Sequence, residues 1–328
     1  MGDVIHALPV ARNAKLAGAE VGWLTEPRYA PLLEGNPSVD RIFTADTRWW
    51  RTNALRYETW RGISSLRSAV REFEPDVTLD VQGLWKSAFL ARLAGAPVVG
   101  FDAANRREPL SAALCGVRVR LPVRRLHVVN KNLTLLKEVG IDISERAPDA
   151  RYLLGRSTEQ ANAFLKSLPK PFAVYHPGAA RPEKAWGEAN YAALARRLYE
   201  ERNLVPVISW GPGDEMCVKR IAELLPMAAV APKLDFFGLA QLSEFSSLFV
   251  AGDTGPLHLA DALGVSTVCL FAAGARNPAW RNGPYRGKSI KVSEPFESVL
   301  RDAQEAIRPP ASMSPDGFVA RDLLLENA

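Results

Sequence analysis

Short apolar runs with β-forming residues alternate with longer segments of helical periodicity along the chain. This alternation predicts an α/β protein with parallel sheets. The strands predicted in the first half cover 20–24, 41–43 and 77–80, the helices cover 55–73 and 85–93, and a short apolar run follows at 97–101. The strands predicted in the second half cover 172–176, 206–210, 248–251 and 267–271, and the helices cover 158–168, 186–201, 214–225 and 256–263.

Two sets of alternating elements predict two doubly wound Rossmann-like domains, 1–155 and 156–328, divided within a polar, proline-containing stretch. The opening GDVIHALPV has the character of a loop and helix that follow a sheet strand, yet no strand precedes it. Either the start is placed too late or the first domain lacks its expected first strand. Beyond residue 294 we expect a helix, a proline-rich segment and a final apolar helix.

Composition is that of an ordinary soluble globular protein, with 47% hydrophobic and 23% charged residues among 328. The cysteines Cys115, Cys217 and Cys269 form no CxxC pair, which argues against a disulfide framework or a zinc site. No apolar run is long enough for a membrane span, and the N-terminus does not have the pattern of a signal peptide.

Charge is unevenly distributed between the two halves. Of the net +5, most lies in residues 1–150, where 21 Lys and Arg face 17 Asp and Glu. This excess favours an anionic partner for the first half, but it is too small to indicate a nucleic-acid binder.

The segment GDTGPLH at 252–258 joins a predicted strand to a predicted helix. A tight glycine-containing loop at a helix N-terminus presents free backbone N–H groups, here of Thr254 and Gly255, and the helix dipole favours a phosphate there. Asp253 and Thr254 are also good N-cap residues, so helix capping explains the same pattern equally well.

Two further strand ends carry polar loops. HPGAA at 176–180 is followed by Lys184, which can neutralise a diphosphate as a point charge or be an ordinary solvated lysine. WGPGDE at 210–215 resembles a dinucleotide fingerprint, but Met216 replaces its last glycine. The Glu215 carboxylate can hold ribose hydroxyls or simply favour the first turn of a helix.

In the first half, Asp3 lies where a strand would lead into a helix, so its carboxylate is a candidate general base or a helix cap. More polar groups occur at predicted element ends in DVQGLWKS (80–87) and RREPL (106–110).

A segment rich in Arg and Trp begins with RWWR at 48–51 and continues to Arg56, Trp60 and Arg61. It can grip an anionic amphiphile, or it can be a basic helix face with buried tryptophans.

Several catalytic motifs are absent from the sequence. GKS at 287–289 is no P-loop, because Asn282 stands where the leading glycine belongs. There is no HExxH, no GxSxG and no cluster of Cys and His, so no metal site is expected.

The ordered succession GDVIHALP, DVQGLWKSA, RREPLS, HPGAARPEKAW, WGPGDE and AGDTGPLHLADALG, over 2–274, resembles the bacterial heptosyltransferase family. GDVIH, QGLWKSA and REPLS are most similar to heptosyltransferase I, which adds heptose to Kdo-lipid A in the lipopolysaccharide inner core. The resemblance implies inverting, metal-independent transfer by a GT-B fold, in which two Rossmann-like domains face a central cleft. The acceptor would bind the N-terminal domain and the donor ADP-L-glycero-β-D-manno-heptose the C-terminal domain.

The resemblance also assigns roles to residues of this chain. It places the catalytic base at Asp3. The residues it places at the donor are Lys184, Glu215, Asp253, Thr254, Gly255 and His258. The residues it places at the acceptor are Lys86 and Arg107. It implies no cofactor, no nucleic acid, and a cytoplasmic enzyme that is peripheral on the inner face of the inner membrane.

Some positions depart from the family pattern. FAAGARNP at 271–278 stands where the family often has a GPTDP-like loop, and Ala179 and Ala180 stand where many relatives have hydroxyl side chains. A glycosyltransferase with another nucleotide sugar or acceptor, and a nucleotide-sugar-binding protein without turnover, are therefore alternatives. A nicotinamide dehydrogenase is disfavoured by the incomplete glycine fingerprint.

Overall fold

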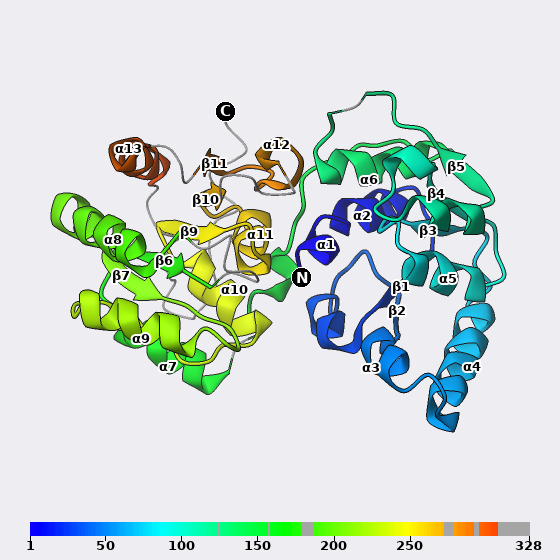
Figure 1. The fold of residues 1–328 in the computed structure, drawn as a ribbon, viewed down its shortest axis with the longest axis horizontal. Helices are drawn as coiled ribbons and strands as arrows, with labels where there is room; N and C mark the ends of the chain where they lie inside the picture. The colour runs from blue at the N-terminus through cyan, green and yellow to red at the C-terminus, as the bar shows by residue number, and fades with distance from the viewer. Residues whose placement is uncertain (124, 157, 179–185, 272–277, 292–294, 308–328) are drawn as a thin grey trace. The chain divides into compact units, whose positions relative to one another are not determined.

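The computed structural model describes all residues except 124, 157, 179–185, 272–277, 292–294 and 308–328 (Figure 1). Contacts divide the chain into two units, one of Met1 with Asp3–Pro148 and the other of Gly2 with Asp149–Ala328. Strands pair only in parallel throughout the described residues, as the alternating pattern predicts. None of the helices described is both long and apolar enough to cross a membrane. The predicted proline-rich segment and final helix fall on 308–328, outside the described residues.

The C-terminal unit is built on a six-stranded sheet with the order β11-β10-β9-β6-β7-β8. Its strands are β6 (Phe172–His176), β7 (Val205–Ile208), β8 (Ala229–Val230), β9 (Leu248–Gly252), β10 (Thr267–Phe271) and β11 (Lys288–Lys291). The chain leaves β6 first toward β7 and β8, and later returns on its other side with β9. This is the strand order of a Rossmann fold, and the direction reverses between β6 and β9.

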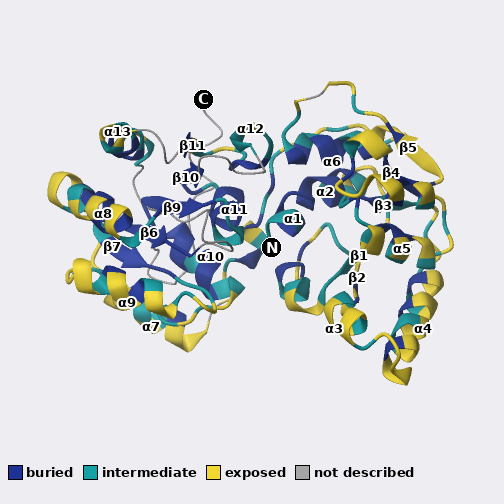
Figure 2. Ribbon diagram, in the orientation of Figure 1, coloured by how far each residue is buried: buried dark blue, intermediate teal, exposed yellow. Residues whose placement is uncertain are grey.

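Helices cover both faces of this sheet, which explains why its strands are continuous apolar runs. They are α7 (Glu159–Ser167), α8 (Glu188–Arg202), α9 (Glu215–Leu224), α10 (Phe236–Glu244), α11 (Gly255–Ala262), α12 (Ala279–Asn282) and α13 (Phe296–Ala306), with the 3₁₀ turn η4 (Arg151–Leu153). All residues of β6, β9 and β10 are buried, whereas α8 and α9 turn exposed residues outward (Figure 2).

The N-terminal unit contains two small parallel sheets among its described residues, β1-β2 and β3-β4-β5. The strands are β1 (Gly22–Thr25), β2 (Arg41–Thr44), β3 (Thr78–Asp80), β4 (Val98–Phe101) and β5 (Val117–Val119). The helices are α1 (Gly2–Ile5), α2 (Leu8–Leu16), α3 (Thr47–Thr52), α4 (Tyr57–Glu72), α5 (Trp85–Leu93) and α6 (Val128–Lys137), with 3₁₀ turns η1 (Pro27–Leu32), η2 (Ala103–Asn105) and η3 (Pro109–Leu114). β1 and β3 do not pair with one another.

Packing ties these elements together in the N-terminal unit. The side chain of Phe43 on β2 is buried with Leu66 and Val70 of α4, and Phe73 contacts Phe43 edge to face at 5.7 Å. Asn13 within α2 is 1% exposed, and its Oδ1 accepts hydrogen bonds from the backbone N–H groups of Ser144 and Glu145. An apolar cluster around β2, further clusters around β4, and a buried amide that joins the first and last segments therefore hold the unit together.

His176, the last residue of β6, is buried at 6% exposure, and its Nδ1 lies 3.0 Å from Ser209 Oγ. Burial lowers the pKa of His176 to about 4, because the charged imidazolium is poorly solvated in the sheet. An unfolded histidine titrates near pH 6.5, so between about pH 4 and 6.5 the unfolded chain binds more protons than the folded one. The stability that neutral His176 preserves is present above pH 6.5 and is lost as the pH falls toward 4.

We therefore predict that His176 accounts for about 2 kcal/mol of the loss in unfolding free energy between pH 7.5 and pH 5. Urea denaturation of the wild type and of His176→Gln at both pH values measures this, since the glutamine does not titrate. An equal pH dependence in the two proteins would show that His176 is not the responsible group.

Candidate active site

The reversal of strand order between β6 and β9 marks one candidate site, at the carboxyl ends of the strands in the C-terminal unit. In open parallel sheets, ligands bind at this switch point because the two neighbouring loops run in opposite directions. The loops after β6 and β9 are the two glycine-containing segments that the sequence singles out, and the loop after the adjacent β7 is the third. Parallel pairing thus gathers three segments that are far apart in the chain.

Thr254 occupies the N-cap position of α11, but its side chain makes no capping hydrogen bond. Its Oγ1 is buried and has no hydrogen-bond partner in the part of the chain that the structure describes. A buried hydroxyl without a partner costs free energy unless a ligand or water meets it. Together with the first-turn N–H groups of α11, from Gly255 onward, it forms an anion-binding arrangement. The capping interpretation of Thr254 is therefore wrong.

His258 lies one turn into α11 and reaches back to the preceding loop. Its Nε2 is 3.2 Å from Asp253 Oδ1, and the two side chains are 4% and 13% exposed. The contact fixes the Asp253 carboxylate at the edge of the anion site, where it can accept hydrogen bonds from ligand hydroxyls.

The loops after β6 and β7 approach one another closely at Gly178. A Cβ atom at Gly178 would lie 2.2 Å from Oδ2 of Asp214, so only glycine fits beside this carboxylate. Asp214 accepts a hydrogen bond from the backbone N–H of Gly211 at 2.9 Å and does not cap α9. Glu215 is the exposed first residue of α9, and Lys184 lies outside the described residues, as do Ala179, Ala180 and residues 272–277.

The second candidate site lies in the N-terminal unit, around Asp3 on α1. Arg107 Nη2 is 2.9 Å from Asp3 Oδ1 and its Nη1 is 3.3 Å from Oδ2, while Gln82 Nε2 lies 3.4 Å from Oδ2. Asp3 and Arg107 side chains are each 40% exposed, so solvent weakens their attraction and other groups can reach them. Asp3 is thus held by residues 79 and 104 positions away in the chain.

Lys86 on α5 belongs to a neighbouring polar cluster. Its Nζ is 2.9 Å from Oε1 of Glu26, which also accepts a hydrogen bond from the Thr47 hydroxyl. Burial acts to raise the pKa of Glu26, but the hydrogen bonds from Thr47 and Lys86 outweigh it and the pKa lies below its ordinary value. Glu26 is therefore ionised at neutral pH and orients the Lys86 side chain through their ion pair. Glu26, Thr47 and Gln82 were not predicted as site residues, and of the three only Gln82 lies in one of the sequence motifs, DVQGLWKS at 80–87.

The segment rich in Arg and Trp forms α3 and the start of α4. Trp49 is 37% and Trp60 62% exposed, so the interpretation as buried tryptophans is wrong for both. Of the three tryptophans in this segment, Trp50 is the one that packs against the apolar cluster of Phe43 and Leu66.

Comparison with known proteins identifies the family. The sequence profile of glycosyltransferase family 9 (heptosyltransferase) matches residues 63–304. Lipopolysaccharide heptosyltransferase 1 of Pseudomonas aeruginosa is 33% identical over 90% of this chain and 82% of the relative. The protein of the same name from Escherichia coli K12 is 28% identical over 94% and 95%. Lipopolysaccharide heptosyltransferase 3 of Escherichia coli is 24% identical over 83% and 81%.

Solved structures give the same picture. The structure of Escherichia coli heptosyltransferase WaaC with ADP matches with a TM-score of 0.77 and 25% identity, over 93% of this chain and 96% of that chain. WaaC with ADP-2-deoxy-2-fluoro heptose matches with a TM-score of 0.74 and 26% identity, over the same shares. The two α/β units are thus the Rossmann-like domains of a GT-B fold. The heptosyltransferase 1 proteins of Pseudomonas aeruginosa and Escherichia coli K12 are more similar to this chain than heptosyltransferase 3 of Escherichia coli is. The chain belongs to glycosyltransferase family 9, the heptosyltransferases.

Proposed function

We propose that this glycosyltransferase transfers L-glycero-D-manno-heptose from ADP-heptose to the Kdo of Kdo-lipid A, with inversion at the anomeric carbon. Its relatives are named lipopolysaccharide heptosyltransferase 1, and solved relatives hold ADP or an ADP-heptose analogue. The observation that carries the proposal is the Asp3 carboxylate, held by Arg107 and Gln82 yet open to solvent.

The donor binds at the switch point of the C-terminal domain. The unpartnered Thr254 hydroxyl and the N–H groups at the start of α11 receive the diphosphate, assisted by Lys184. Asp253, oriented by His258, accepts hydrogen bonds from the heptose hydroxyls, and Glu215 from the nucleoside. This arrangement stabilises the negative charge that develops on the leaving ADP.

The acceptor binds the N-terminal domain, where Lys86 and Arg107 meet its phosphate and carboxylate groups. Asp3 takes the proton from the acceptor hydroxyl as that oxygen bonds to the anomeric carbon. The bond from the anomeric carbon to the ADP oxygen breaks with its electron pair leaving on the diphosphate. A single displacement of this kind requires one base and inverts the configuration.

The α3–α4 segment supports a further part of the proposal, peripheral binding at the cytoplasmic face of the inner membrane. The exposed arginines Arg48, Arg51, Arg56, Arg61 and Arg67 form no ion pair within the described residues. Exposed apolar side chains accompany them, namely Trp49, Leu55, Tyr57 and Trp60. Tyr57, Trp60 and Arg61 line one shallow groove on α4. A surface with both exposed arginines and exposed aromatic side chains suits an anionic bilayer. The arginines can contact the anionic headgroups, and the aromatic rings can insert at the membrane interface.

The base assignment predicts that Asp3→Asn lowers turnover about 10²- to 10⁴-fold, because the amide cannot take the proton. ADP binding, measured by calorimetry, should stay at the wild-type value, since the donor site lies on the other domain. Asp76→Asn removes an exposed carboxylate from the same domain and serves as the matched control. Unchanged turnover in Asp3→Asn would overturn the assignment.

For the membrane, the triple variant Arg51→Ala, Arg56→Ala and Arg61→Ala is expected to weaken binding to vesicles containing phosphatidylglycerol, by roughly five-fold per arginine. Co-sedimentation with these vesicles, and with neutral phosphatidylcholine vesicles, measures the effect. The control removes equal charge from the C-terminal domain by Lys166→Ala, Arg202→Ala and Lys219→Ala. Equal losses in both triple variants would exclude α3–α4 as the membrane-binding surface.

A further inference from the structure

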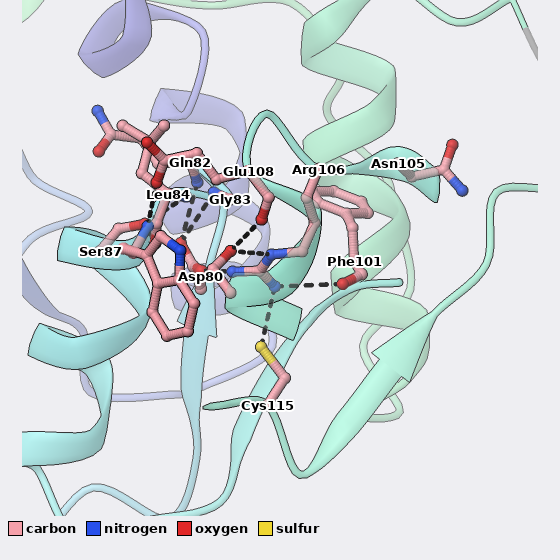
Figure 3. Close-up of polar contacts among 12 residues, drawn as sticks. Asp80, Gln82, Gly83, Leu84, Ser87, Phe101, Asn105, Arg106, Glu108 and Cys115 are labelled. Carbon is pink, nitrogen blue, oxygen red and sulfur yellow. Dashed lines mark hydrogen bonds and ion pairs between the residues drawn. The ribbon is translucent and has the colours of Figure 1, made fainter. Parts of the chain in front are cut away.

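A buried ion pair lies beneath the Asp3 site. The side chains of Arg106 and Asp80 are 0% and 1% exposed, and they meet through Nη2 and Oδ2 (Figure 3). The other guanidinium donors are also used: Nε donates to Ser111 Oγ at 2.8 Å, and Nη1 donates to the Phe101 carbonyl at 3.1 Å and contacts Cys115 Sγ at 2.9 Å. Because desolvation offsets most of the attraction in a buried pair, such a pair is better explained by the geometry it fixes than by stability.

The first structure that this pair fixes is the turn after β3. Asp80 Oδ1 accepts hydrogen bonds from the backbone N–H groups of Gln82 at 3.2 Å and Gly83 at 3.1 Å. Gly83 has φ +68°, and a Cβ there would lie 3.3 Å from the Cβ of Arg106. The Gly83 carbonyl accepts a hydrogen bond from the backbone N–H of Glu108 at 3.1 Å. The turn is thus held between Asp80 and the segment that carries Arg106.

The two side chains that contact Asp3, those of Gln82 and Arg107, belong to residues next to the Asp80–Arg106 pair and the turn after β3. Gln82 follows Asp80 by two residues, with its backbone N–H bound to that carboxylate, and its Nε2 lies 3.4 Å from Asp3 Oδ2. Arg107 is the chain neighbour of Arg106 and contacts both oxygens of Asp3. Asp3 itself makes no contact with the buried pair among the interactions the structure describes, so any influence of Arg106 on Asp3 passes through these two residues.

The geometry points to Arg106 as a positioning residue for heptose transfer, one that anchors Asp80 and thereby sets Gln82 and Arg107 around Asp3. This inference rests on the proposed function, because Asp3 is the base only in that reaction. Arg106 does not touch the reacting atoms. Its guanidinium is inside the domain, and room for it exists because Gly100 has no side chain: a Cβ there would lie 2.6 Å from Nη1.

The test compares Arg106→Met and Asp80→Asn with the wild type in acceptor-dependent ADP release. Asp80→Asn keeps an oxygen for the turn but loses the ionic contact, and it changes side-chain volume little, so it remains useful if Arg106→Met fails to fold. We expect kcat to fall about 10- to 100-fold and the KM for Kdo-lipid A to rise, because small displacements of catalytic groups are costly. The Kd for ADP should not change, whereas general unfolding would reduce the fraction of protein that binds ADP.

Cys115→Ala is the matched control, because it removes a buried contact of the same guanidinium without reaching the turn after β3. It should keep the wild-type kcat and KM. A second readout is independent of turnover: the amides of Gln82 and Gly83 should exchange with deuterium faster in Arg106→Met than in the wild type. If both test variants keep the wild-type kinetics and the wild-type amide exchange, the inference is overturned. The proposed function still stands in that case, provided that the wild type is active. If the wild type does not transfer heptose but exchange at Gln82 and Gly83 is faster in Arg106→Met, the proposed function alone is contradicted.

Discussion

Parallel strand pairing is the constraint on which both candidate sites depend. Neighbouring parallel strands end at the same edge of a sheet, so the loops that follow them are brought together although their sequences are far apart. In the C-terminal domain this places the loops after β6, β7 and β9 side by side. In the N-terminal domain the end of β3 supplies the turn that reaches Asp3. The strand topology therefore brings the loops of each candidate site together, whatever side chains those loops carry.

The two domains use charge in different ways. The Asp80–Arg106 pair is fully buried, and each of the three guanidinium nitrogens of Arg106 has a partner, which suits a fixed support. The Asp3–Arg107 pair above it is partly exposed, so either partner can exchange its contact for one with a substrate. In the C-terminal domain the positive end of α11 and the buried Thr254 hydroxyl replace side-chain cations within the described residues. The buried Asp80–Arg106 pair thus serves as support, whereas Asp3, Arg107 and the start of α11 are the groups that can contact ligands.

Much of the fold follows from local pattern. The bounds predicted for β6, β10 and α5 agree with the structure, because buried parallel strands are continuous apolar runs and α5 begins after a turn. The edge strands β5 and β8 were missed, since they are short and partly exposed. GKS at 287–289, rejected as a P-loop, lies largely in β11. Helix α10 was missed because it is apolar on most sides and lacks a clear period.

The candidate sites divide in the same way. Asp253, Thr254 and Gly255 could be predicted because strand, loop and helix are adjacent in sequence. The partners of Asp3 and Lys86 could not be derived from local pattern, since Gln82 and Glu26 reach them only through the tertiary fold. The central claim is tested most directly by acceptor-dependent release of ADP from ADP-heptose in the presence of Kdo-lipid A. The account predicts release that requires both substrates; no release, with ADP still bound by the C-terminal domain, would contradict it and favour another substrate or a non-catalytic role.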